Sequence, residues 1–160
     1  MARDSAGVKG PGAFLAFFLF AYASTAHGAP GHIPLGTSKD MALALMKQIG
    51  PISMLADGGE TFQVLQAGGV ETWICHGVVT RSTVQSVGDL ADFVRSVEKA
   101  QNLFGGANSA GASALGAPTV ELRWNVGSDR YELISFSQYR DGTTAVGDKI
   151  TYADWDSRCK

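Results

Sequence analysis

Apolar residues recur with helical spacing in two stretches of the chain. The first stripe consists of Ala42, Leu45, Met46 and Ile49. It predicts a helix that ends at Gly50-Pro51, because proline cannot continue a helix. Residues 87–104 show the same period and predict a longer helix, which begins with a capping pattern at Ser86 and Asp89 and ends at Gly105.

Elsewhere the pattern changes to short alternating runs separated by glycine turns. The predicted strands are 52–55, 61–66, 70–79, 120–126, 130–139 and 143–152. The clearest alternation runs from Val120 to Val126. The resulting order is helix, three strands, helix, three strands. It predicts an α+β domain over residues 37–160, in which helices cover one face of an antiparallel sheet of about five or six strands.

The run from Val70 to Val79 is the central strand of this prediction, because it has the densest β-forming composition in the sequence. Neighbouring residues of a strand point to opposite faces. We therefore expect His76 to share one face with Thr72, and Cys75 to share the other with Trp73. Residues 105–118 are rich in glycine and alanine and predict a flexible loop without regular structure.

The N-terminus has the features of a secretory signal peptide. A weakly basic start precedes an unbroken apolar run from Ala13 to Ala23, and an A-x-G site follows at 26–28. The run is too short to span a bilayer, which requires about 20 residues. We expect residues 1–28 to be removed, residues 29–36 to form an irregular lead-in that contains His32, and the mature protein to be soluble, without stable membrane insertion, in the periplasm or outside the cell.

Both cysteines lie in the mature part of the chain, and an oxidising compartment favours their pairing. Cys75 and Cys159 permit only one intramolecular disulfide, which would join the central strand to the end of the chain. The alternative is a buried free Cys75, with Cys159 on a frayed tail.

Composition and motifs exclude several kinds of site. The formal net charge is -2 and no run of Lys and Arg occurs, so we expect no nucleic-acid partner. No metal or cofactor motif is present, and no catalytic signature is visible. His76 is the weak candidate for a catalytic residue, acting with a carboxylate.

Aromatic and arginine side chains gather in the predicted strands. Such a composition is typical of a recognition surface if one face of the sheet is open. The candidate binding residues are Trp124, Arg123, Tyr139 and Arg140. The leading hypothesis is an exported, non-enzymatic binding or accessory protein of the cell envelope, with an envelope protein or a small ligand as its partner. The alternatives are a small hydrolase-like enzyme that uses His76, and a structural protein that the disulfide holds together and that has no site.

Overall fold

The computed structural model of the protein describes residues 31–114 and 116–160, so the predicted signal peptide, residues 1–28, lies outside the described residues. Two similar halves follow one another, each a helix with four strands. The first half consists of α1 (Lys39–Ile49), β1 (Ile52–Asp57), β2 (Phe62–Ala67), β3 (Val70–Cys75) and β4 (Val78–Val87). The second consists of α2 (Leu90–Phe104), β5 (Ser109–Ser113), β6 (Thr119–Val126), β7 (Arg130–Gln138) and β8 (Thr144–Tyr152), and a short helix α3 (Trp155–Arg158) ends the chain.

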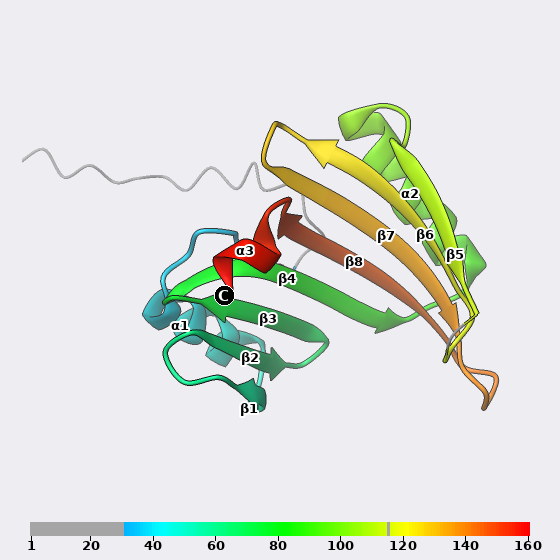
Figure 1. Cartoon of the computed structure of the whole chain (residues 1–160). Helices are drawn as coiled ribbons and strands as arrows, with labels where there is room; N and C mark the ends of the chain where they lie inside the picture. The colour runs from blue at the N-terminus through cyan, green and yellow to red at the C-terminus, as the bar shows by residue number, and fades with distance from the viewer. Residues whose placement is uncertain (1–30, 115) are drawn as a thin grey trace, which may run out of the picture.

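All these strands form one antiparallel sheet, with the order β1-β2-β3-β4-β8-β7-β6-β5 (Figure 1). Each half is a meander, and the last strands of the two halves pair at the centre, from Arg81 opposite Thr151 to Val87 opposite Ala145. The α+β class and the antiparallel sheet are confirmed. The predicted five or six strands are too few, because the sheet has eight.

Two separate hydrophobic cores lie on the same face of the sheet. Ala42 and Met46 of α1 are fully buried in the first core, against side chains of β2, β3 and β4. In the second core, Phe93 and Ala100 of α2 pack with Trp124 and other side chains of β6, β7 and β8. Figure 1 shows α1 and α2 behind the sheet and α3 in front of it. No helix within the described ranges is long and apolar enough to cross a membrane.

The predicted central strand, 70–79, is two strands joined by a tight turn. β3 ends at Cys75 and β4 begins at Val78, while His76 and Gly77 form the turn with φ angles of 48° and 80°. Positive φ at both residues of a two-residue loop is the geometry of a type I′ hairpin, which glycine favours in the second position. The prediction that His76 shares a strand face with Thr72 is therefore wrong.

Two segments that lack an alternating apolar pattern nevertheless form strands. Residues 80–86 are polar, yet they belong to β4, which is paired on both sides. Residues 109–113 lie within the predicted loop 105–118 but form β5, an exposed edge strand that pairs with β6. These two strands account for the difference between the predicted and the observed sheet.

The second helix begins later than its sequence pattern predicts. Asp89 caps it by accepting a hydrogen bond from the backbone of Asp92, whose side chain in turn accepts from the backbone of Asp89. This capping box starts the helix at Leu90. Val87, which the pattern places in the helix, instead ends β4 and is 88% exposed.

Cys75 and Cys159 lie at disulfide distance, as predicted, with their Cα atoms 5.0 Å apart. The bond joins the end of β3 to the residue that follows α3. Beside it, the hydroxyl of Thr80 lies 3.1 Å from Sγ of Cys75, and the Thr80 side chain is fully buried. The disulfide therefore anchors α3 on the face of the sheet that α1 and α2 leave open.

We expect the variant Cys159→Ser to be markedly less stable than the wild type. The disulfide closes a loop with a sequence separation of 84 residues, and on the chain-entropy model such a link stabilises the fold by roughly 4–5 kcal/mol. For a chain of this size that is a fall in Tm of roughly 10–20 °C. Calorimetry with and without a reductant measures it. The control is the double variant Cys75→Ser/Cys159→Ser, which should melt like the single variant and ignore the reductant; a wild-type Tm that reduction leaves unchanged contradicts the prediction.

Candidate binding surface

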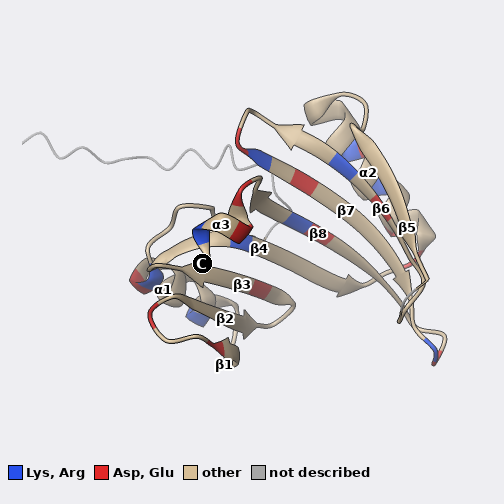
Figure 2. Cartoon of the chain, viewed as in Figure 1, with Lys and Arg blue, Asp and Glu red and all other residues tan. Residues whose placement is uncertain are grey.

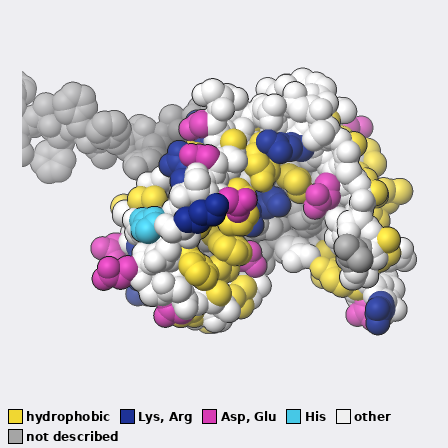
Figure 3. All heavy atoms as spheres, viewed as in Figure 1, with side chains coloured by type: hydrophobic (Ala, Val, Ile, Leu, Met, Phe, Trp, Pro, Cys, Tyr) yellow, Lys and Arg dark blue, Asp and Glu magenta, His cyan; other side chains and the backbone are white. Residues whose placement is uncertain are grey.

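The face of the sheet opposite α1 and α2 carries a row of aromatic and basic side chains. The strand register places Trp73, Arg81, Thr151 and Tyr131 side by side across β3, β4, β8 and β7. The next row contains Glu71, Thr83, Lys149, Leu133 and Arg123. Figure 3 shows this face, where hydrophobic, basic and acidic side chains alternate over the centre of the sheet. We name it the open face.

At one end of the open face, two tryptophan rings hold Arg81. The rings of Trp73 and Trp155 lie 5.5 Å apart in an edge-to-face arrangement. The guanidinium carbon of Arg81 lies 3.6 Å from the centre of the Trp155 ring and 5.1 Å from that of Trp73. The indole of Trp73 also donates a 2.8 Å hydrogen bond to Glu71, which fixes its orientation. Arg81 is thus positioned by aromatic faces rather than by a carboxylate.

At the other end of the open face, Arg123 has a similar arrangement. Its guanidinium carbon lies 3.9 Å from the centre of the Tyr131 ring, and both side chains are half-buried. The sequence analysis names Arg123 as a binding residue, and the structure places it on the open face. Its ring partner Tyr131 comes from the neighbouring strand β7, opposite Asn125 of β6.

Lys149 of β8 lies between the two arginines. Burial lowers the pKa of its ammonium group, and the nearby charges of Arg81 and Arg123 lower it further, while Glu121 and Glu71 act in the opposite direction. Burial also lowers the pKa of Arg81. Burial is the largest cause of both pKa shifts, because a half-buried cation loses part of its hydration.

Two shallow hollows adjoin the open face near Tyr139. The first has a volume of about 260 Å³ and is lined by Glu71, Thr83, Gln85 and Tyr139 among others; the amide of Gln85 donates a 2.7 Å hydrogen bond to the Tyr139 hydroxyl. The second, of about 430 Å³, lies between Tyr139, Arg140 and the segment Gly116-Ala117. Two predicted binding residues therefore meet the end of the predicted loop at the β7–β8 hairpin.

Trp124, the remaining predicted binding residue, is in the core. It is 0% exposed, lies on the helix-covered face, and donates a 3.0 Å hydrogen bond to the carbonyl of Gly105 at the end of α2. Strand alternation alone cannot tell which face of β6 is covered. The structure thus leaves no surface of Trp124 for a ligand, and Tyr131 is the aromatic residue that lies beside Arg123.

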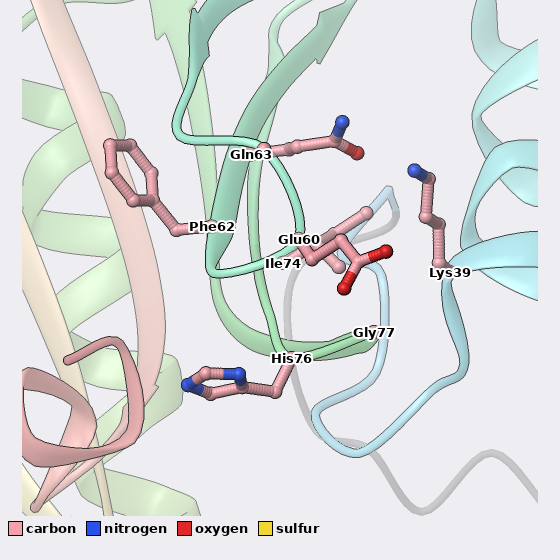
Figure 4. A pocket seen from close by; sticks show the side chains of 8 residues that line it. Lys39, Glu60, Phe62, Gln63, Ile74, His76 and Gly77 are labelled. Carbon is pink, nitrogen blue, oxygen red and sulfur yellow. The ribbon is translucent and has the colours of Figure 1, made fainter.

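His76 lines a different hollow, of about 380 Å³, at the turn between β3 and β4. Figure 4 shows the side chains of Lys39 and Glu60 reaching toward each other across it, while the imidazole of His76 points away from Glu60. The Nε2 atom of His76 lies 3.2 Å from the backbone oxygen of Lys160. The carboxylate of Glu60 is therefore not aligned with His76, as the enzyme hypothesis would require.

His32, which the sequence places in an irregular lead-in, is held against the centre of the sheet. Its Nδ1 lies 3.3 Å from the hydroxyl of Ser82, and its Nε2 lies 3.2 Å from a carboxylate oxygen of Asp148. The backbone N–H of Ile33 donates to the same hydroxyl at 3.0 Å. This Ser–His–Asp set resembles a catalytic arrangement in its residue types, but Ser82 is 0% exposed and has no access to a substrate. We therefore assign it a structural role.

Next to this set, Glu132 is a buried acid on the helix-covered face of β7, 4% exposed. Burial and the neighbouring Asp148 raise its pKa from 4.5 to about 8, and Lys99 offsets part of the rise. The proton is therefore retained in the folded protein at neutral pH. No sequence motif marks Glu132, because the residues around it follow the pattern of an ordinary strand.

We expect the protein to lose stability as the pH rises from about 4.5 to about 8. Between these values the unfolded chain releases the proton of Glu132 while the folded chain keeps it, so the free energy of unfolding falls with pH, by an amount on the order of 2–4 kcal/mol. The variant Glu132→Gln should show a smaller fall in Tm between pH 5 and pH 8. Glu98→Gln, at an exposed position of α2, is the control and should follow the wild type. Equal pH dependence in Glu132→Gln and the wild type contradicts this assignment.

Comparison of the chain with models of known protein families, with curated proteins and with solved structures finds no match.

Proposed function

We propose that the protein is exported and acts as a non-enzymatic binding protein of the cell envelope, and that its open face contacts the partner. The observation that carries this proposal is the set of half-buried aromatic and basic side chains on the face opposite α1 and α2. Trp73, Arg81 and Tyr131 lie in one row of the sheet there, and Arg123 and Lys149 in the next. Tryptophan, tyrosine and arginine are the residues that contribute most to binding energy at protein interfaces.

The shape of the open face supports a macromolecular partner over an enclosed small molecule. The hollows that adjoin this face are shallow and open to solvent, and the side chains of Gln66, Gln85 and Thr83 line part of the first. Small-molecule sites are usually enclosed and bury most of the ligand surface. A partner that lies across several strands fits this surface better.

Two observations weigh against an enzyme. The imidazole of His76 is directed toward the backbone oxygen of Lys160, and the serine beside His32 is sealed in the interior. General acid–base catalysis requires a base within hydrogen-bonding reach of an accessible reacting atom. The site geometry therefore favours binding.

The proposal is tested by cross-linked affinity capture from envelope extract, using two matched variants. Leu133→Asp introduces a charge at the centre of the open face, between Lys149 and Arg123. Val94→Asp introduces the same charge on α2, where the side chain is 44% exposed on the opposite side of the molecule. A partner of the open face should be captured by the wild type and by Val94→Asp, and at least tenfold less by Leu133→Asp. Circular dichroism checks that both variants fold.

Two outcomes contradict the proposed function. One is the capture of the same species in equal amounts by both variants. The other is that the wild type retains no defined species, which favours the alternative of a structural protein without a site.

A further inference from the structure

We propose that Arg81, Lys149 and Arg123 bind the carboxylates of an extended acidic peptide segment of the partner. This inference rests on the proposed function and specifies the chemistry that the open face recognises. Arg81 lies on β4, Lys149 on β8 and Arg123 on β6, and Figure 2 shows how basic positions are distributed over the strands of the sheet.

None of the three cations forms an ion pair within 4.0 Å in residues 31–114 and 116–160, although Glu71, Glu121 and Asp156 lie near enough to influence Lys149 or Arg81. The ion pairs in the described part of the chain involve other residues: His32 with Asp148, Arg95 with Asp92, Arg130 with Asp129 and Arg158 with Asp154. In addition, Nε of Arg81 and Nε of Arg123 are buried and have no hydrogen-bond acceptor in the described part of the chain. A partly buried cation without a close counter-ion is unfavourable, so an anion bound at the accessible part of each group would offset this cost.

The aromatic contacts hold the two guanidinium groups without using their donors. Stacking of Arg81 on Trp155 and of Arg123 on Tyr131 occupies the flat faces of the groups. Nε is buried in both residues, so the terminal Nη groups are left for a ligand, and two Nη–H donors of a planar guanidinium can bind a carboxylate through parallel hydrogen bonds. Both arginines are therefore pre-oriented, which lowers the entropic cost of binding.

The spacing of the cations matches an extended peptide. Arg81 and Lys149 lie diagonally on adjacent strands, and such positions are about 7–8 Å apart. Lys149 and Arg123 flank Leu133 in one row, two strands apart, which is about 10 Å. Alternate residues of an extended peptide point to the same side about 6.5–7 Å apart. Glutamates at alternate positions would thus reach successive cations, given the length of the Lys and Arg side chains.

Other polyanions fit the open face less well. Glu71 and Glu121 lie close enough to Lys149 to influence it, and Asp156 does the same for Arg81. The chain as a whole has a net charge of -2. A uniformly charged nucleic acid or sulfated polysaccharide would be repelled by these carboxylates, whereas a peptide can alternate its acidic side chains with neutral ones that contact Leu133 and Tyr131.

The probe for this proposal is a synthetic peptide of alternating Glu and Thr, with the corresponding Gln–Thr peptide as the neutral control. Isothermal titration calorimetry should show binding of the Glu–Thr peptide that weakens as salt is added, and no binding of the Gln–Thr peptide. Arg81→Gln, Lys149→Gln and Arg123→Gln should each weaken binding about tenfold. Arg95→Gln, which removes an equal charge from the exposed surface of α2, should bind like the wild type.

A folding defect is separated from a binding defect by Arg123→Lys, which keeps the charge and should recover part of the affinity that Arg123→Gln loses. The proposal is overturned if the Gln–Thr peptide binds equally well or if the three variants bind like the wild type. Binding of heparin but not of the peptide would also overturn it, since it would assign the cations to a sulfated polysaccharide.

The result is distinguishable from a failure of the proposed function. If Leu133→Asp loses its captured partner while the Glu–Thr peptide does not bind, the open face is a binding surface but the acidic-peptide chemistry is wrong. If Leu133→Asp captures the same species as the wild type, the proposed function itself fails.

Discussion

The pairing of β4 with β8 is the interaction on which the rest of the structure depends. Each half of the chain forms its own meander, covers it with its own helix, and buries its own hydrophobic core. The two cores contain no common residue. The halves are joined by the continuous antiparallel ladder from Arg81 opposite Thr151 to Val87 opposite Ala145. Without this ladder there would be two four-stranded units in place of one sheet.

Both faces of this central ladder carry polar groups, and for different reasons. On the helix side, α1 and α2 each cover their own half, and the strip between them contains Ser82 and Asp148, against which His32 packs. On the other side the same two strands present Arg81 and Lys149. If the β4–β8 ladder were apolar on both faces, one apolar face would be exposed to water or would need a further helix to cover it. Because the ladder is polar on both faces, the segment around His32 can cover one face while the other remains open.

The sequence pattern predicts the elements whose burial is one-sided and apolar. The helical stripe at Ala42 and Met46, the alternation from Val120 to Val126, and the pairing of Cys75 with Cys159 all appear in the structure. The pattern fails where a strand is held by hydrogen bonds to neighbouring strands and not by burial of its own apolar side chains. β4 is polar because its side chains lie in the central β4–β8 ladder and on the open face. β5 is a run of small residues that pairs with β6.

The candidate site is harder to predict for a topological reason. Arg81, Arg123 and Lys149 are far apart in the sequence, so no basic cluster is visible there. They come together because β8 pairs with β4 on one side and with β7 on the other. Likewise, the sequence analysis assigns Trp124 and Arg123 to one binding surface, although alternation in β6 puts them on opposite faces, and the position of α2 decides that Trp124 is the buried one. His76 is a candidate because of its residue type alone. In the structure it lies in the turn between β3 and β4, and not on a strand face beside Thr72.

One wall of the open face is supplied by the end of the chain, and this affects how the protein responds to proteolysis. Trp155, which stacks on Arg81, belongs to α3, beyond the last strand. A protease that cuts after Tyr152 would leave all the strands intact. The severed peptide would remain attached through Cys159 and Cys75, so the Trp155 ring would be released only if the disulfide were also reduced. Cleavage and reduction would have to occur together to remove this wall.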